Sequence, residues 1–127
     1  MKRAVSTTQA PAAIGPYSQA VEANGLVFLS GQIPLDPATG ALVSGDIARQ
    51  TEQVMANLEA VLRQAGCGFD DAVRSTIYLT DLGDFATVNE VYGRRFTQVP
   101  PARATVQVAA LPKGARVEID LIAVRPA

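Results

Sequence analysis

The order of apolar and polar residues predicts a strand hairpin near the start of the chain. Residues 18–22 and 26–32 fit the pattern of two strands, and Ala23-Asn24-Gly25 separates them. An Asn-Gly pair at such a position is typical of a β-hairpin turn. The segment 26–32 is apolar on both faces, which predicts a central strand covered on both sides. Residues 33–45 contain two prolines and two glycines and are predicted to form a loop.

Two later segments carry apolar residues at helical spacing. The first follows Asp46, a residue type favoured at helix N-caps, and its apolar positions recur every three or four residues from Ile47 to Leu62. Gly66 is predicted to end this helix, because glycine readily adopts the left-handed conformation beyond a helix C-terminus. The second helix is predicted from about Phe85 to Phe96, with Asp84 as its N-cap.

The remaining apolar segments predict strands at residues 73–79, 104–108 and 117–124. The predicted order of elements is therefore ββαβαββ. A right-handed crossover through each helix would make the flanking strands parallel to one another. The expected fold is α+β, with a mixed sheet and both helices packed on one of its faces.

The other face of this sheet would have no cover within one chain. Along the strand that begins near Arg103, alternation gives two sets of side chains: Ala104, Val106 and Val108, or Arg103, Thr105 and Gln107. We expect the apolar set to face the helices and the polar set to face away from them. Since an uncovered sheet face with apolar content usually binds a partner, we expect an oligomer with polar residues lining clefts between subunits.

Composition narrows the class of protein. At 127 residues the chain is expected to form one domain, residues 1–127, and its 48% apolar content argues against disorder. A net charge of -1 and a pI near 5.3 give the protein no excess of positive charge that would attract nucleic acid.

Cys67 is the only cysteine, and we interpret it as a small apolar side chain rather than a nucleophile. No apolar segment has the length of a signal peptide core or membrane span, so we expect a cytoplasmic protein.

The sequence contains no histidine, so Arg103 and Glu118 are the first candidates for chemistry. Pro100 and Pro101 fix the backbone ahead of Arg103, whose neighbours are uncharged, and a guanidinium can bind a carboxylate through two parallel hydrogen bonds. Glu118 lies between two apolar residues and therefore belongs to the opposite face of the strand from them. If that face forms a cleft, partial desolvation would raise the pKa of Glu118. A guanidinium and a carboxylate on adjacent strands can bind a small anion and orient a water. Glu118 is equally compatible with a solvated residue or an ion pair to Arg103 or Arg116.

Four further residues are candidates for a binding site. Tyr17 follows a rigid Gly-Pro turn and can cover a ligand, although it can equally be a packing aromatic. Gly31 permits close approach of the backbone, and Ser30 can bind a ligand or satisfy a backbone group. Asn89 lies within the apolar stripe of the second helix, where a buried amide that ties down a loop is the favoured interpretation. No cluster of residues has the spacing of a metal site or a phosphate-binding loop.

Several segments together resemble the reactive intermediate deaminase family, also called the YjgF-type or 2-iminobutanoate/2-iminopropanoate deaminase family. The resemblance covers nearly the whole chain. Its motifs are Ala12 to Ala20, Ser30-Gly31-Gln32-Ile33-Pro34, Asp81 to Asn89, Pro101-Ala102-Arg103, Leu111-Pro112-Lys113 and Val117-Glu118-Ile119.

The resemblance implies a chorismate-mutase-like fold and a homotrimer with active sites between subunits. It implies hydrolysis of 2-imino and enamine acids, such as 2-iminobutanoate and 2-iminopropanoate, to 2-keto acids and ammonia. The family's reaction requires no cofactor and no metal. The expected partners are the imino acid and two further copies of the chain, with no nucleic acid and no membrane.

The resemblance also implies roles for individual residues. Arg103 would hold the substrate carboxylate and Glu118 would position the attacking water. Tyr17, Ser30, Gly31 and Asn89 would line or support the pocket. Many members of the family carry a cysteine where this chain has Thr105. Imine hydrolysis needs no covalent nucleophile, so we expect Thr105 to contribute through its backbone or through a hydrogen bond from its hydroxyl.

Three other functions fit the same sequence less well. A non-catalytic binder of keto or amino acids would need Arg103 but not Glu118. A chorismate mutase, suggested by the fold, would need more than one cationic group for its dianionic substrate. A ribonuclease or translation inhibitor, a function also attached to this family, is disfavoured by the acidic pI and the absence of histidine.

Overall fold

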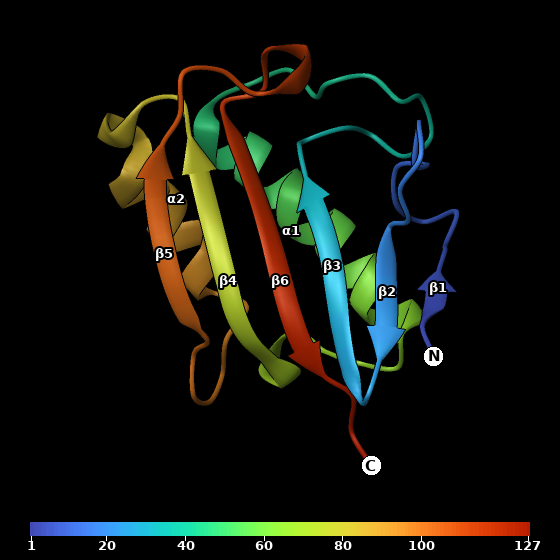
Figure 1. The fold of residues 1–127 in the computed structure, drawn as a ribbon. Coiled ribbons are helices and arrows are strands. Elements are labelled where there is room, and N and C mark those ends of the chain that lie inside the picture. The colour runs from blue at the N-terminus through green and yellow to red at the C-terminus, as the bar shows by residue number, and fades with distance from the viewer.

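A computed structural model describes residues 1–127 as a six-stranded sheet with two α-helices on one face (Figure 1). The strands are β1 (Arg3–Val5), β2 (Ala20–Ala23), β3 (Leu26–Gln32), β4 (Ala72–Leu79), β5 (Ala102–Gln107) and β6 (Val117–Val124). The helices are α1 (Ile47–Gln64) and α2 (Phe85–Gly93), together with short 3₁₀ segments η1 (Phe69–Asp71), η2 (Leu82–Asp84) and η3 (Pro112–Gly114).

The strands lie in the order β1-β2-β3-β6-β4-β5. β4 and β5 are parallel, and every other neighbouring pair is antiparallel. Because β3 and β4 both run antiparallel to β6, they are parallel to each other, as the crossover argument required. The predicted α+β architecture, with a mixed sheet and both helices on one face, is confirmed.

Several features of the sheet differ from the prediction. β3 is not covered on both sides within one chain, because Phe28 is 43% exposed on the face away from the helices. β1 is an additional strand of three residues, too short for an apolar pattern to indicate, and it pairs with β2 at the edge of the sheet. β6 lies between β3 and β4, so it is not adjacent to β5. The expectation that Arg103 and Glu118 lie on adjacent strands is therefore wrong.

The hairpin and the first helix form where the sequence predicts them. Asn24 and Gly25 have φ angles of 52° and 75°, the left-handed conformation that a tight hairpin turn requires. The Asp46 side chain accepts a hydrogen bond from the Arg49 backbone N–H at 2.9 Å and so caps α1. Gly66 follows the helix with a φ of 79°.

α2 ends at Gly93, three residues before the predicted end at Phe96. A glycine weakens a helix interior, and beyond it the backbone continues in turns, with Phe96 N–H donating to Gly93 C=O at 3.3 Å. The Phe96 ring still packs on Tyr92, with centroids 4.8 Å apart. The apolar stripe therefore continues beyond the helix, which is why the pattern overestimated its length.

The main core lies between the sheet and α1. Its fully buried side chains include Val54 and Leu58 of α1, Ile77 of β4, and Ile119 and Leu121 of β6. Each of these strands alternates buried residues with partly exposed ones, so one face of the sheet packs on the helices.

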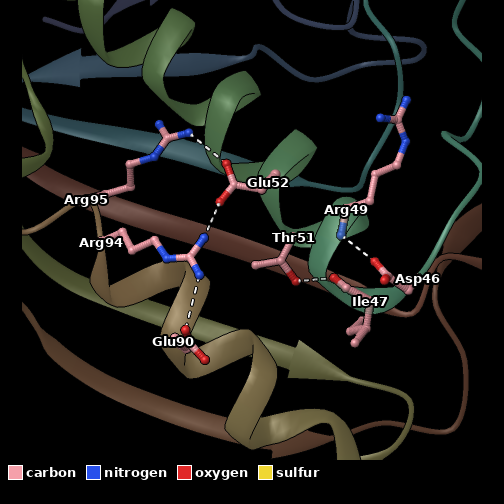
Figure 2. A network of polar contacts seen from close by, with 8 residues as sticks. All are labelled: Asp46, Ile47, Arg49, Thr51, Glu52, Glu90, Arg94 and Arg95. Carbon is pink, nitrogen blue, oxygen red and sulfur yellow. Dashed lines mark hydrogen bonds and ion pairs between the residues drawn. The ribbon is translucent and has the colours of Figure 1, made fainter.

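Ion pairs join the two helices on their solvent side (Figure 2). Glu52 of α1 pairs with Arg94 at 3.7 Å and with Arg95 at 3.5 Å, and Arg94 also pairs with Glu90 of α2 at 3.1 Å. Most of these side chains are exposed, and exposed pairs of this kind contribute little, about 0–1 kcal/mol each. Apolar packing therefore determines how the helices sit on the sheet.

The side chains of β5 lie on the opposite faces of the sheet from those expected. Its parallel register with β4 pairs Ile77 with Thr105, and paired residues of neighbouring strands face the same side. Since Ile77 is buried under the helices, Arg103, Thr105 and Gln107 also lie on the helix side, and Val106 lies on the uncovered side. β5 is an edge strand beside the short α2, partly exposed along its length, so polarity does not determine which face turns inward.

Candidate functional site

The candidate residues form two separate groups. We call the first the arginine cluster: Arg103 and Thr105 of β5 with Phe85, Asn89 and Tyr92 of α2. We call the second the glutamate pocket: a cavity lined by Tyr17, Gly31, Gln32, Lys113 and Glu118, among others.

In the arginine cluster, the guanidinium of Arg103 rests against α2. Its Nη1 donates a hydrogen bond to Asn89 Oδ1 at 2.7 Å. Its central carbon lies 5.2 Å from the centre of the Tyr92 ring and 5.5 Å from that of Phe85. Both Arg103 and Asn89 are exposed, so the group is open to a ligand. The interpretation of Asn89 as a buried amide tying down a loop is wrong, because its oxygen binds Arg103 instead.

Tyr92 is buried beneath Arg103. Its hydroxyl forms a hydrogen bond of 2.6 Å with the hydroxyl of Ser75, a buried residue of β4. Burial raises the pKa of Tyr92, partly offset by the Ser75 hydrogen bond and the Arg103 charge. The phenol therefore stays neutral, and its ring presents an uncharged aromatic face to the guanidinium.

Thr105 has an unused hydrogen-bonding group. Its Oγ1 is inaccessible to solvent and has no hydrogen-bond partner within the chain. It lies two residues along β5 from Arg103 and on the same face. A buried hydroxyl without a partner is costly, so this atom is suited to a hydrogen bond with a group that comes from outside the chain.

The glutamate pocket has a volume of about 380 Å³. Glu118 enters it from β6, and the exposed ring of Tyr17 forms part of its wall. Burial raises the pKa of Glu118, and the nearby negative charge of Asp120 raises it further. A carboxylate with a raised pKa is a stronger proton acceptor than an ordinary glutamate, as general-base chemistry requires.

Gly31 provides the space that Glu118 occupies. A Cβ atom at position 31 would overlap the Glu118 carboxylate, with only 2.9 Å to its Cδ. The backbone at Gly31 is part of an irregularity in the pairing of β3 with β6 between Leu29 and Gln32. The expected close approach is therefore present, and the group that approaches is the candidate base itself.

Ser30 supports the segment that carries Tyr17. Its Oγ donates to the C=O of Ser18 at 2.6 Å, and its backbone N–H donates to the C=O of Gln19 at 3.0 Å. Ser30 thus satisfies backbone groups, one of the two roles the sequence allowed, and it does not line the glutamate pocket.

Lys113 brings a cation to the pocket. Its backbone has a φ of 58°, a left-handed conformation that is unusual for a residue other than glycine, and its Nζ donates to the C=O of Gly40 at 3.5 Å. Lys113 belongs to a segment that resembles the family, but its residue type and spacing alone do not indicate a pocket position. A long-range loop contact places it there.

The two groups lie on opposite faces of the sheet. Ile77 pairs with both Thr105 and Ile119, so these three residues face the helices. Glu118 is next to Ile119 and therefore faces the uncovered side. One copy of the chain does not bring Arg103 and Glu118 into a common cavity.

The structure indicates neither a metal site nor a membrane segment among its residues. No three side chains of the His, Cys, Asp or Glu type converge where they could share a metal ion. Neither helix combines the length and the apolar character that crossing a membrane requires.

Comparison with known proteins identifies the family. The model of the family described as Endoribonuclease L-PSP matches residues 7–125. Protein DfrA of Myxococcus xanthus is 65% identical over 125 residues, which span 97% of this chain and 95% of that protein. The 2-iminobutanoate/2-iminopropanoate deaminase of Mus musculus is 50% identical over 125 residues, which span 98% and 93%.

Solved structures agree with this result. The crystal structure of YyfA from Yersinia pestis, described as a member of the conserved Rid protein family, superposes with a TM-score of 0.96 at 50% identity, covering 98% of this chain and 99% of that one. The resemblance drawn from the sequence motifs is thus confirmed. The chain belongs to the Endoribonuclease L-PSP family, also known as the Rid or YjgF-type family.

Proposed function

We propose that this protein hydrolyses 2-imino and enamine acids, including 2-iminobutanoate and 2-iminopropanoate, to 2-keto acids and ammonia. The observation that carries the proposal is the pair of complementary groups: an exposed guanidinium held on α2 and a carboxylate whose pKa burial raises. Deaminases named for these two imines are about 50% identical to the chain over nearly its full length, which favours an enzyme over a non-catalytic binder.

The proposed chemistry needs only these groups. Arg103 binds the substrate carboxylate through the edge of its guanidinium that Asn89 does not use. Glu118 accepts a proton from a water, whose oxygen attacks the imine carbon, and the C=N double bond becomes a C–N single bond as the nitrogen takes that proton from Glu118. Glu118 then accepts the hydroxyl proton of the resulting carbinolamine and passes it to the nitrogen, which leaves as ammonia while the oxygen forms the C=O of the keto acid. The net change is addition of one water and release of one ammonia. Proton transfer to a positioned carboxylate supplies about 10²–10⁴-fold in rate.

The proposed site is assembled from two copies of the chain. Arg103 of one subunit would meet the Glu118 pocket of the next, because the two groups of one chain lie on opposite faces of its sheet. We propose the homotrimer that the family resemblance implies, in which this pairing is repeated around a threefold axis. Exposed apolar residues on the uncovered face, namely Phe28, Val106 and Val124, support association through that face.

Thr105 takes part in this site as a hydrogen-bonding residue. Its unpartnered Oγ1 adjoins Arg103 and suits a contact with substrate or with the attacking water. The proposed reaction uses the arginine cluster and the glutamate pocket and needs no cofactor. Removal of reactive imines released by amino-acid dehydratases is metabolite damage control, and we propose the cytoplasm as its place.

The test is the lifetime of a freshly formed imine. 2-Iminobutanoate is generated with an amino-acid oxidase, and the imine that survives is trapped with semicarbazide. Wild-type protein in catalytic amounts should reduce semicarbazone formation, and Arg103→Ala should not. The matched control is Arg63→Ala, which should behave as wild type. It removes an exposed arginine of α1 that belongs to neither the arginine cluster nor the glutamate pocket.

Unchanged trapping with wild-type protein would contradict the deaminase function. Calorimetric titration of 2-ketobutyrate into wild type and Glu118→Ala then identifies a binder. Equal affinity in both proteins, without turnover in either, would support a sensor that uses Arg103 alone.

A further inference from the structure

The Arg103 side chain is exposed, yet it lies against α2 through three contacts. Arginine has about 2 kcal/mol of side-chain rotamer entropy, and an exposed arginine on an edge strand ordinarily samples many rotamers. The Asn89 hydrogen bond restrains one nitrogen only. A single hydrogen bond leaves the guanidinium plane free to rotate about it, so bidentate binding of a carboxylate would require further ordering on each encounter.

Two aromatic rings supply the missing restraint. Phe85, Asn89 and Tyr92 recur at helical spacing on one face of α2, so the two rings flank the amide that binds Nη1. The centre of the guanidinium lies 5.2 Å and 5.5 Å from the ring centres, within the range of cation–π attraction. The amide fixes the position of Nη1, and the two rings restrain the rotation of the guanidinium plane about that hydrogen bond.

The Tyr92 ring is itself held from the sheet. Its hydroxyl binds Ser75 at 2.6 Å, and Ser75 is the residue of β4 that pairs in register with Arg103 of β5. The Phe96 ring also packs on it, with ring centres 4.8 Å apart. Strand β4 therefore fixes the helix ring on which the neighbouring strand's arginine rests.

We propose that Phe85 and Tyr92 are positioning residues, which hold the Arg103 guanidinium in one plane so that its free edge is preorganised for a planar carboxylate. The proposal rests on the carboxylate-binding role of Arg103 under the proposed function. Ser75 acts one step further away, through the Tyr92 hydroxyl. Preorganisation of this kind strengthens binding by removing the ordering that the ligand would otherwise have to impose.

The first test removes one ring and keeps an apolar residue in its place. Phe85→Leu should raise the KM for 2-iminobutanoate and the Kd for 2-ketobutyrate by about 2–5-fold, the effect of an exposed cation–π contact. Its kcat should stay within about twofold, because the water-activating carboxylate belongs to the other group. Phe85→Tyr, which restores an aromatic face, should recover wild-type KM.

The chain offers a matched control in Phe69. Arg95 lies 5.5 Å from the centre of the Phe69 ring, the same distance as Arg103 from Phe85, but Phe69 is a core residue of η1 outside the arginine cluster. Phe69 is the more buried ring, so Phe69→Leu should destabilise the protein more than Phe85→Leu does. If lost stability were the cause of the change in KM, the control would show the larger effect.

A second measurement does not depend on turnover. In ¹⁵N NMR spectra the Arg103 side-chain N–H should show ring-current shifts and restricted motion, and Phe85→Leu should reduce both. Tyr92→Phe, which keeps the ring but loses the Ser75 hydrogen bond, should show a smaller change of the same sign. An Arg103 signal and a KM that Phe85→Leu leaves unchanged would overturn the proposal. Absence of turnover in wild type would instead contradict the proposed function, and the NMR result would still decide the positioning role.

Discussion

At the scale of single residues, Gly31 shows how the absence of a side chain determines the position of another. The Glu118 carboxylate occupies the volume that a Cβ at position 31 would fill. Gly31 does not have a positive φ, so the requirement for glycine comes from space and not from conformation.

Gly31→Ala should therefore displace Glu118 without unfolding the protein. A shift of about 1 Å in a reacting group can cost about 10²-fold in rate, and we expect a loss of that order in the imine-trapping assay. Gly68→Ala is the matched control, because nothing lies within 4 Å of its added Cβ and its φ is not positive. Full activity in Gly31→Ala would show that the carboxylate acts from a position other than the one beside Gly31.

The pKa of Glu118 leads to a second prediction at this scale. The charge of Asp120, whose Oδ2 accepts a hydrogen bond from the Tyr78 hydroxyl at 3.1 Å, adds to the effect of burial. A general base must be deprotonated, so a raised pKa moves the acid limb of the pH–rate profile upward. Asp120→Asn removes the charge and should move that limb to lower pH.

The profile of kcat/KM against pH measures this shift directly. If kcat/KM also falls at alkaline pH, Asp120→Asn should leave the pH of that alkaline limb unchanged. An acid limb at the same pH in both proteins would mean that a group other than Glu118 controls it.

At the scale of elements, Asp70 links η1 to the segment that follows α2. Its Oδ2 accepts from the Thr97 hydroxyl at 2.6 Å, and its Oδ1 accepts from the Thr97 backbone N–H at 3.2 Å. These hydrogen bonds favour the charged carboxylate and hold the pKa of Asp70 below its ordinary value. The unfolded chain therefore takes up the proton at a higher pH than the folded chain does.

The stability that Asp70 provides should be complete above its ordinary pKa of 3.8 and should be lost as pH falls through the lower folded value. Asp70→Ala should thus lower the thermal midpoint at neutral pH, and the difference from wild type should narrow below pH 3.8. Thr97→Val should show the same trend. A deficit that stays constant down to the acid limit would exclude the ionised hydrogen bond as its cause.

The elements also show what the sequence can predict. α1 was predictable because Asp46, the apolar stripe and Gly66 all indicate the same helix. α2 was predicted too long because Phe96 continues the stripe after the backbone has left the helix. The facing of β5 was predicted wrongly because an edge strand is partly exposed on both sides and its neighbour's register, not its own polarity, decides which face turns inward.

At the scale of the whole molecule, the candidate site could be predicted as a set of residues but not as an arrangement. The residues themselves and then the motif resemblance both indicated Arg103 and Glu118, and each lies in an environment that suits its proposed role. The insertion of β6 between β3 and β4 is a long-range pairing that no local pattern encodes. That order places β4 between Arg103 and Glu118, and the register of β5 and β6 on β4 turns the two residues to opposite faces of the sheet, so assembly is a condition of the proposed reaction.

A mixture of two inactive variants tests this condition. Arg103→Ala keeps an intact glutamate pocket, and Glu118→Gln keeps an intact arginine cluster. In a mixed trimer, a complete site forms where the intact arginine of one subunit meets the intact pocket of the next, which happens at one of the three interfaces and gives about a third of wild-type activity. The two proteins should be co-expressed with different tags so that mixed oligomers can be isolated and assayed by imine trapping. The double variant mixed with either single variant should stay inactive, since no complete site can form. If the isolated mixed oligomers are as inactive as their parents, Arg103 and Glu118 do not act across a subunit boundary.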